Sequence, residues 1–282
     1  MYSRVNPIKL FDITLRDGLQ YISKKYSLKE KQVIFNKIAT NYRPNSIEIG
    51  SIDNPKIVPQ MDNSLELFKY ANDFKSVIDN SIDIYMLTPN NKSLQKAINN
   101  NVKNFSFITS VSNEFQEINI NKSLSETKSE IEKMVNSVII IDNYKIKLYI
   151  SCISECPIRG HINLQNIIDE ILFYYYSYEN INNFCLSDTC GSLKFIEFKF
   201  ILDELIKRNV DITKISLHLH KQKDNQNINN IIRYAILNNI TNFDVSSIPN
   251  LASSKKNITS NLYYDTICHS KSSIYSDKSS TL

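Results

Sequence analysis

The sequence alternates along its whole length between short strand-forming segments and longer helix-forming segments. The strand-forming segments are rich in Ile, Phe, Tyr or Val. They are Ile8–Thr14, Ser46–Ile49, Ile82–Met86, Asn104–Thr109, Ile146–Ser151, Phe184–Ser187, Ile215–His220 and Asn242–Val245. Strands that alternate with helices predict a parallel sheet, and eight is the number of strands that closes a (β/α)8 barrel. We therefore expect an α/β fold of the TIM-barrel class.

Segments with helical periodicity lie between the strand-forming runs. The first has a clear start, because Ser27 can cap a helix and Glu30 at the third helical position completes a capping box. The predicted helices span Leu28–Asn41, Lys92–Asn101, Ser125–Asp142, Leu164–Asn180, Ser192–Asn209 and Asn227–Asn239. No Gly/Ser-rich linker interrupts the alternation, so we predict one catalytic domain over residues 1–269. The Ser- and Lys-rich tail, residues 270–282, is predicted to be disordered.

The composition narrows the class of protein. The chain has 282 residues, of which 42% are hydrophobic and 22% charged, which is enough for a large core. A net charge of +4, with lysines spread along the predicted helices, argues against a nucleic-acid partner and suits an anionic small substrate. Glycine occurs only four times, so asparagine is expected to take left-handed turn positions. With no membrane-length apolar run, no signal peptide and an odd five cysteines, we expect a soluble cytoplasmic protein without a membrane partner.

Polar side chains stand where the predicted strands end, and this is the face of a (β/α)8 barrel that carries the chemistry. They are Arg16, Asp17, Glu48, Asp188, His218, His220 and Asp244. The neighbours Arg16 and Asp17 can form a structural ion pair, or can be half of an active site with the carboxylate on a metal and the guanidinium on a substrate oxygen. The pair alone leaves both interpretations open. We expect Asp244 to orient the last loop.

The triplet "HLH" is the most informative of these strand ends. In a strand, residues two apart point to the same face, so His218 and His220 project together into the barrel mouth. They could be two core histidines with satisfied hydrogen bonds, but a pair at a strand end favours metal ligation. Asp17 is a natural third ligand. Imidazole and oxygen ligands without a thiolate suit Mg or Mn, and remain compatible with Zn.

Seven sequence segments occur in one order and carry a family resemblance. They are "DITLRDGLQ", "IVPQMDNS", "MLTPNNKSLQKAI", "SCISECPIRGHI", "LSDTCG", "SLHLH" and "FDVSS" with a later "SN". Together they resemble the metal-dependent TIM-barrel lyases of the 3-hydroxy-3-methylglutaryl-CoA (HMG-CoA) lyase family, which share a superfamily with the isopropylmalate and homocitrate synthases. The resemblance runs from about Ile8 to Asn261. "RDGLQ" and the two histidines mark the superfamily, whereas "VPQM", "LTPN" and "SCISECP" together favour the lyase branch.

The resemblance implies a role for each matching residue. Asp17, His218 and His220 would bind a divalent cation, Mg or Mn, with Asn261 as the fourth protein ligand. The proposed catalytic residues are Arg16, Glu48, Asp188, His218 and Ser254. Of these, Arg16 would stabilise the enolate oxygen, Glu48 would hold Arg16 or substrate near the metal, and Asp188 would take the hydroxyl proton with His218 close to its path.

The chain departs from the family pattern in the loop after the eighth strand. The family has a glycine-rich loop with a reactive cysteine there, but the corresponding stretch, Ser247–Asn261, contains neither residue type. Ser254 falls roughly at the cysteine position, where its hydroxyl could donate a hydrogen bond. Lys221 stands where the family has an acidic residue.

These observations predict a lyase that cleaves HMG-CoA to acetyl-CoA and acetoacetate, with an acyl-CoA as its small-molecule substrate. A related aldol-type lyase, or an acyl-CoA condensing enzyme acting on another hydroxy or oxo acid, is the second hypothesis. The third is a degenerate barrel that binds without turnover, because of the altered loop. The family also suggests a homodimer.

Overall fold

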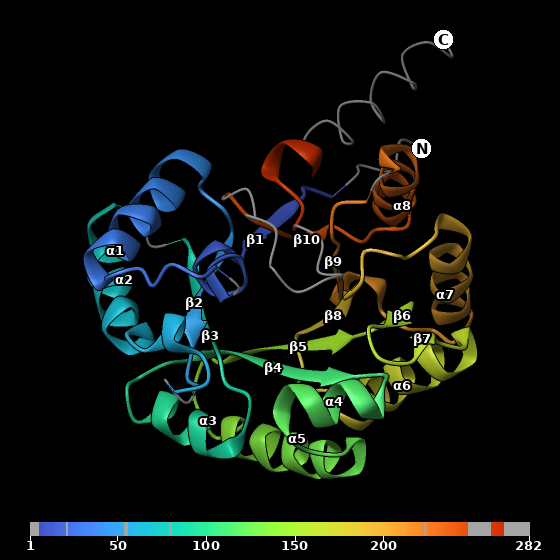
Figure 1. Cartoon of the computed structure of the whole chain (residues 1–282), viewed down its shortest axis with the longest axis horizontal. Helices are drawn as coiled ribbons and strands as arrows, with labels where there is room; N and C mark the ends of the chain where they lie inside the picture. Colours follow the sequence, from blue (N-terminus) through green and yellow to red (C-terminus); the bar gives the residue numbers. More distant parts are fainter. Residues whose placement is uncertain are drawn as a thin grey trace.

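Eight parallel strands form a closed barrel surrounded by helices (Figure 1). This computed structural model describes residues 6–20, 22–53, 56–78, 81–222, 224–247 and 261–267, with the side chain of residue 78 excepted. The strands are β1 (Lys9–Asp12), β2 (Ser46–Ser51), β3 (Asp83–Leu87), β4 (Asn104–Ser110), β5 (Lys145–Ser151), β8 (Asn183–Ser187), β9 (Ile215–His218) and β10 (Asn242–Val245). All eight predicted strands and the TIM-barrel fold are thus confirmed, with strand ends that shift by up to two residues.

The ring closes between the first and the last strand. β1 pairs with β10 along all four of its residues, from Lys9 to Asp12. On its other side β1 meets β2 only at Phe11 and Asp12, whereas β4 and β5 pair along their whole length. Pairing is therefore shortest at two places in the ring, between β1 and β2 and between β9 and β10, with two paired residues on each strand.

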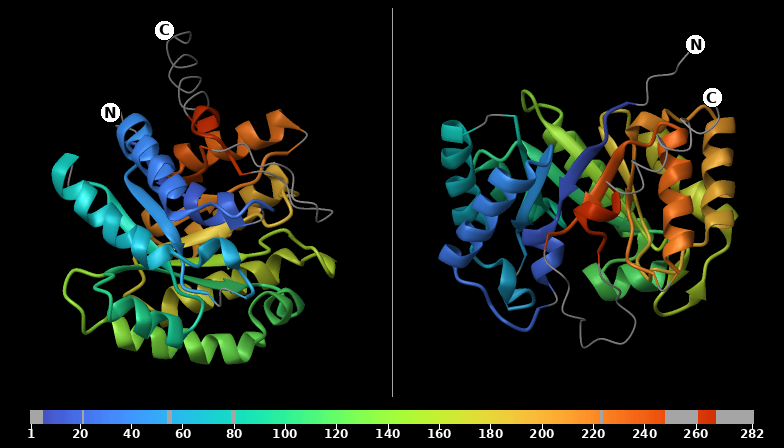
Figure 2. Two further views of the ribbon diagram at one scale, coloured as in Figure 1. Left: turned by 60° about the vertical axis from the view of Figure 1, so that its left-hand side comes forward. Right: turned by 90° about the horizontal axis from the view of Figure 1, so that it is seen from above.

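The helices cover the outside of the barrel, as the turned views show (Figure 2). They are α1 (Leu28–Lys37), α2 (Ser64–Ile78), α3 (Asn91–Ile98), α4 (Asn113–Ile120), α5 (Leu124–Val138), α6 (Leu164–Ser177), α7 (Phe195–Lys207) and α8 (Asn225–Leu237). The six predicted helices are present, with the capping box of Ser27 and Glu30 at the start of α1. Within the described residues, no helix combines the length and the apolar character needed to span a membrane.

Several elements were not predicted. Helices α2 and α4 were missed, as was the two-stranded hairpin of β6 (Glu155–Cys156) and β7 (Gly160–His161). The first helix passes at Ile38 into a π-helical turn, Ile38–Tyr42. The predicted tail, residues 270–282, lies outside the described residues.

Asparagine does take the left-handed turn positions that glycine usually fills. Five of the seven described non-glycine residues with positive φ are asparagines. They are Asn101, Asn121, Asn143, Asn209 and Asn239. Four of them follow closely on the ends of α3, α4, α7 and α8, where a left-handed residue lets the backbone leave the helix.

The barrel strands bury both of their faces. On β5, Ile146, Leu148 and Ile150 belong to the large hydrophobic cluster between strands and helices. The alternate residues Lys147 and Tyr149 face the barrel interior, because the Lys147 ammonium lies 3.5 Å from the centre of the Phe11 ring and 4.8 Å from that of Tyr149. The interior thus holds charged and aromatic groups next to the mouth.

Candidate active site

A π-helical turn, η1 (Thr14–Gly18), presents Arg16 and Asp17 at the mouth of the barrel. β1 ends at Asp12, earlier than predicted, because the Asp12 carboxylate accepts a hydrogen bond from the Thr14 backbone N–H at 2.9 Å. The Gly18 N–H then donates to the Ile13 carbonyl at 3.1 Å, which closes the turn. The sequence prediction of strand up to Thr14 was therefore wrong by two residues.

Three predicted metal ligands lie together at this mouth. Asp17, His218 and His220 each offer a ligand atom, and these atoms all lie within 4.8 Å of one another. Asp17 follows β1, His218 ends β9, and His220 makes an isolated antiparallel bridge with Asn261. The turn after the first strand and the end of β9 thus meet at this cluster of possible ligand atoms.

Hydrogen bonds fix the orientation of both imidazoles. His220 Nδ1 lies 2.6 Å from the Asp188 backbone carbonyl, which can only accept, so Nδ1 carries the hydrogen and Nε2 keeps its lone pair. His218 Nδ1 lies 3.2 Å from Asp244 Oδ2, a carboxylate acceptor. Burial, followed by the neighbouring His218, lowers the pKa of His220 to about 4. His220 is therefore neutral at pH 7, as a metal ligand must be.

The carboxylate of the cluster is held in its charged form. Burial alone would raise the pKa of Asp17, but the Arg16 guanidinium and then the two histidines lower it to about 2. An ionised carboxylate beside two imidazoles is a suitable set of ligands for a divalent cation.

Asn261 completes this set. Its Nδ2 donates to Asp17 Oδ2 at 2.8 Å, and its Oδ1 is buried without a hydrogen-bond partner among the described residues. A buried oxygen without a partner normally costs free energy, and a cation at this point would satisfy it. The residues present therefore fit a divalent metal.

Arg16 is buried beside this cluster and is held on two sides. Its NH1 donates to Asp17 Oδ1 at 2.5 Å, and its Nε donates to Glu48 Oε2. Tyr149 donates its hydroxyl to the same Glu48 oxygen at 3.2 Å, and its ring centre lies 5.1 Å from the guanidinium carbon. The other Glu48 oxygen, Oε1, is buried and has no partner within the described residues. The predicted contact between Glu48 and Arg16 is thus present.

Asp188 lies at the end of β8, but its carboxylate is already engaged. It accepts the backbone N–H groups of Ser192 at 3.0 Å and Leu193 at 3.1 Å, and the Gln222 side chain at 3.3 Å. Burial raises its pKa. Its proton-transfer role stays a prediction, and Ser254 lies outside the described residues.

Sequence reasoning missed Lys147. Asp244 was expected to orient the last loop, most of which lies outside the described residues, so that role stays a prediction. Its carboxylate lies inside the barrel, between the Lys147 ammonium and the His218 ring. The signal for Lys147 was its position between two apolar residues of the predicted strand Ile146–Ser151, which gives it the face opposite to theirs.

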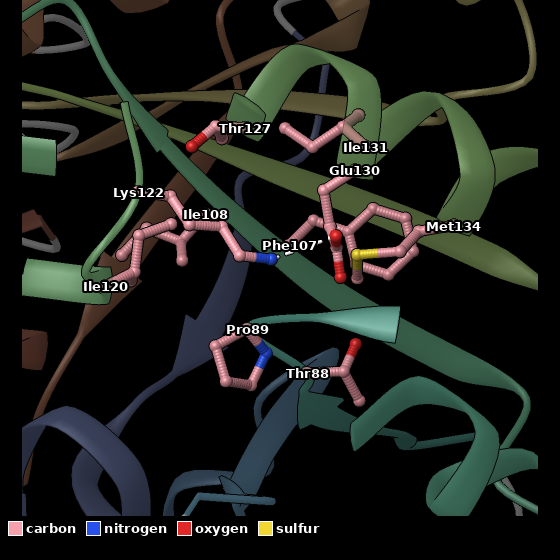
Figure 3. Close-up of a pocket in the computed structure, with 10 residues that line it drawn as sticks. All are labelled: Thr88, Pro89, Phe107, Ile108, Ile120, Lys122, Thr127, Glu130, Ile131 and Met134. Carbon is pink, nitrogen blue, oxygen red and sulfur yellow. Dashed lines mark ion pairs between the residues drawn. The ribbon is translucent and has the colours of Figure 1, made fainter. Parts of the chain in front are cut away.

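Two cavities differ greatly in volume. One of about 290 Å³ lies against Asn261 and is lined by Lys221, Gln222, Asn225 and Tyr263 among others. The other, about 10 Å³, lies between the end of β3, β4 and α5 (Figure 3). It is bordered by the Lys122–Glu130 ion pair, at 2.9 Å, and has room for no more than about one water molecule. Of these two cavities among the described residues, the one beside Asn261 approaches the size of a ligand pocket.

Comparisons with known proteins point to one family. The family model described as HMGL-like matches residues 7–229, a stretch that includes Asp17 and His220 but ends before Asn261. A hydroxymethylglutaryl-CoA lyase of Bacillus subtilis is 26% identical over 242 residues, which cover 85% of this chain and 76% of that protein. The mitochondrial hydroxymethylglutaryl-CoA lyase of Bos taurus is 26% identical over 215 residues, 76% of this chain and 62% of that protein.

Solved structures share the fold. An HMG-CoA lyase from Brucella melitensis has a TM-score of 0.82 at 20% identity, covering 95% of this chain and 91% of that one. An HMG-CoA lyase from Acinetobacter baumannii, in complex with coenzyme A and 3-methylmalate, also has a TM-score of 0.82, at 18% identity over 97% of this chain and 86% of that one.

Proposed function

The chain belongs to the HMGL-like family and is a lyase-like enzyme of the HMG-CoA lyase type, and we propose that it cleaves HMG-CoA to acetyl-CoA and acetoacetate with a divalent cation. The observation that carries this proposal is the meeting of Asp17, His218 and His220 beside the buried Arg16. The coenzyme A in the Acinetobacter relative supports an acyl-CoA substrate.

We assign the cation to four side chains. Asp17, His218 and His220 would hold it, with Asn261 Oδ1 as the fourth ligand atom. When bound, a divalent cation supplies Lewis-acid polarisation of the hydroxyl and carboxylate oxygens of the substrate. Oxygen and imidazole ligands without a thiolate favour Mg or Mn.

Arg16 would stabilise the charge that develops on the thioester. Breaking the bond between the hydroxyl-bearing carbon and the carbon next to the thioester leaves an electron pair on the acyl-CoA fragment, as an enolate. The guanidinium supplies a fixed positive charge to the enolate oxygen and cannot lose its proton at neutral pH. Glu48 and Tyr149 hold the guanidinium in place.

Two proton transfers complete the reaction. The tertiary hydroxyl loses its proton as the carbon–carbon bond breaks, and we propose Asp188 as the acceptor, with His218 close to the path. The enolate carbon then takes up a proton to become the acetyl group of acetyl-CoA. We propose that Ser254 assists there by donating a hydrogen bond.

Acetoacetate release from HMG-CoA, measured with Mg or Mn, tests the proposal. Arg16→Gln should reduce kcat by about 10²–10³-fold, because it removes the charge at the enolate oxygen. Arg208→Gln is the matched control, since Arg208 follows α7 at the opposite end of the barrel and pairs with Glu204. Equal activity in the wild type and Arg16→Gln would contradict the assigned role.

A panel of other hydroxyacyl-CoA and oxo-acid substrates separates the remaining hypotheses. Turnover of another substrate, with none of HMG-CoA, would indicate a related aldol-type lyase or a condensing enzyme. Metal binding without turnover of any substrate would indicate a degenerate barrel.

A further inference from the structure

The barrel interior below His218 contains a buried ion pair. Lys147 of β5 and Asp244 of β10 form it, and their side chains are 2% and 1% exposed. β5 and β10 are not neighbours in the sheet, so this pair spans the inside of the barrel. Charged residues are rarely buried in a barrel core, which is usually filled by branched apolar side chains.

Each oxygen of the Asp244 carboxylate has a separate partner. Oδ1 accepts from the Lys147 ammonium, and Oδ2 faces His218 Nδ1 at 3.2 Å. The Cys185 thiol also points at Oδ2, at 3.7 Å. The carboxylate is therefore a bridge from Lys147 to the metal-ligand imidazole.

Aromatic rings hold both ends of this bridge. The Lys147 ammonium lies over the rings of Phe11 and Tyr149, at 3.5 and 4.8 Å from their centres. The His218 ring packs edge-on against Tyr149, with 6.0 Å between ring centres. These ring contacts pack against the ammonium and the imidazole on either side of the carboxylate.

We propose that Asp244 and Lys147 are positioning residues that hold His218 as the Nδ1–H tautomer with Nε2 turned to the cation site. Asp244 accepts the hydrogen of Nδ1, so the lone pair stays on Nε2. Lys147 compensates the buried charge of the carboxylate and fixes its position. A ligand histidine commonly donates its second nitrogen to such a carboxylate, and loss of the partner weakens metal binding about 10–100-fold. This inference rests on the cation site of the proposed function.

The test replaces the whole pair rather than one partner. A single substitution leaves a buried charge uncompensated, whereas apolar residues of similar volume in place of a buried ion pair often preserve the fold. We therefore choose the double variant Lys147→Met/Asp244→Leu. The matched control is Lys145→Met/Asp83→Leu, which removes a partly exposed ion pair, at 2.5 Å, between β5 and β3.

Mn binding, measured by calorimetry, should weaken about 10–100-fold in Lys147→Met/Asp244→Leu and stay unchanged in the control. Lys147→Arg keeps the charge and should bind Mn close to the wild-type affinity. A folded Lys147→Met/Asp244→Leu variant that binds Mn within about twofold of the wild type would overturn the proposal. Wild-type protein that binds no divalent cation would instead contradict the proposed function.

A second measurement uses the wild-type protein, so it does not depend on whether a variant folds. Nitrogen-15 chemical shifts of the histidines in the metal-free wild type distinguish the two tautomers, and the chain has only four histidines. His218 protonated at Nδ1 supports the proposal, and His218 protonated at Nε2 overturns it. Neither result depends on turnover.

Discussion

Replacing Asp12 by Asn should stabilise the protein at alkaline pH. Asp12 is fully buried at the end of β1 and accepts hydrogen bonds from the Thr14 N–H at 2.9 Å, the Thr14 hydroxyl at 3.0 Å and the Tyr264 hydroxyl at 2.7 Å. Burial nevertheless raises its pKa from 3.8 to about 6. An asparagine can keep the bond from the Thr14 N–H through Oδ1, and the hydroxyls can rotate to accept from its amide.

The magnitude follows from the two pKa values. They differ by about 2, and each whole pKa unit corresponds to 1.36 kcal/mol, so the ionised carboxylate destabilises the fold by about 3 kcal/mol. Because the folded pKa is above the unfolded one, the contribution of the protonated acid is complete below about pH 4 and is lost as the pH rises through 6. Asp12→Asn should therefore raise the free energy of unfolding by about 3 kcal/mol at pH 8 and by about 1.5 kcal/mol at pH 5.

Urea denaturation of the wild type and Asp12→Asn at pH 5 and pH 8 measures this difference. Other titrating groups contribute equally to both proteins, so they cancel in the comparison. Tyr264→Phe is a useful contrast, since it removes one hydrogen bond to the carboxylate and should destabilise the fold by about 1 kcal/mol. A free-energy gap between wild type and Asp12→Asn that is the same at both pH values would refute the reasoning.

Two further variants test the packing and the cation site. In Gly50→Ala the new Cβ would lie 2.3 Å from Ser64 Oγ, so the melting temperature should fall by an amount equivalent to about 1–3 kcal/mol. The double variant Gly50→Ala/Ser64→Gly should recover most of this loss. Equal instability of the two variants would show that the clash is not the cause. Asp17→Asn removes the carboxylate from the four assigned cation ligands, so Mn should bind at least about tenfold more weakly by calorimetry. The partly exposed Asp62→Asn should leave Mn binding unchanged.

The strands were predictable because local sequence determines them. Asn242–Val245 was predicted with its observed ends, since the alternation of polar and apolar residues in NFDV is typical of a strand. The pairing of His218 and His220 followed from the two-residue period of a strand. The π-helical turn at Arg16 was not predictable in the same way, because it depends on the Asp12 side chain capturing the Thr14 N–H. Local preference for strand was overridden by one hydrogen bond.

The buried ion pair of Lys147 with Asp244 was not predicted, for a different reason. A lysine that alternates with apolar residues resembles the solvent-exposed face of a strand, and Lys145 on β5 is indeed exposed. Lys147 has the same period, but ring closure places it inside the barrel opposite Asp244. The strand sequence predicts that Lys147 faces away from Ile146 and Leu148, but only the tertiary arrangement shows that this face lies inside the barrel.

The short seam between β1 and β2 also bears on how the barrel fluctuates. Strand pairing there ends after Phe11 and Asp12, so amide exchange by local opening should begin at this seam. One side-chain link crosses it at the mouth, the ion pair of Arg16 with Glu48. On the other side of β1, Asn261 donates a hydrogen bond to Asp17. The Arg16–Glu48 ion pair, which we assign to the chemistry, thus also holds a short edge of the ring together, and a cation bound by Asp17, His218 and His220 would join the beginning of the barrel to its end.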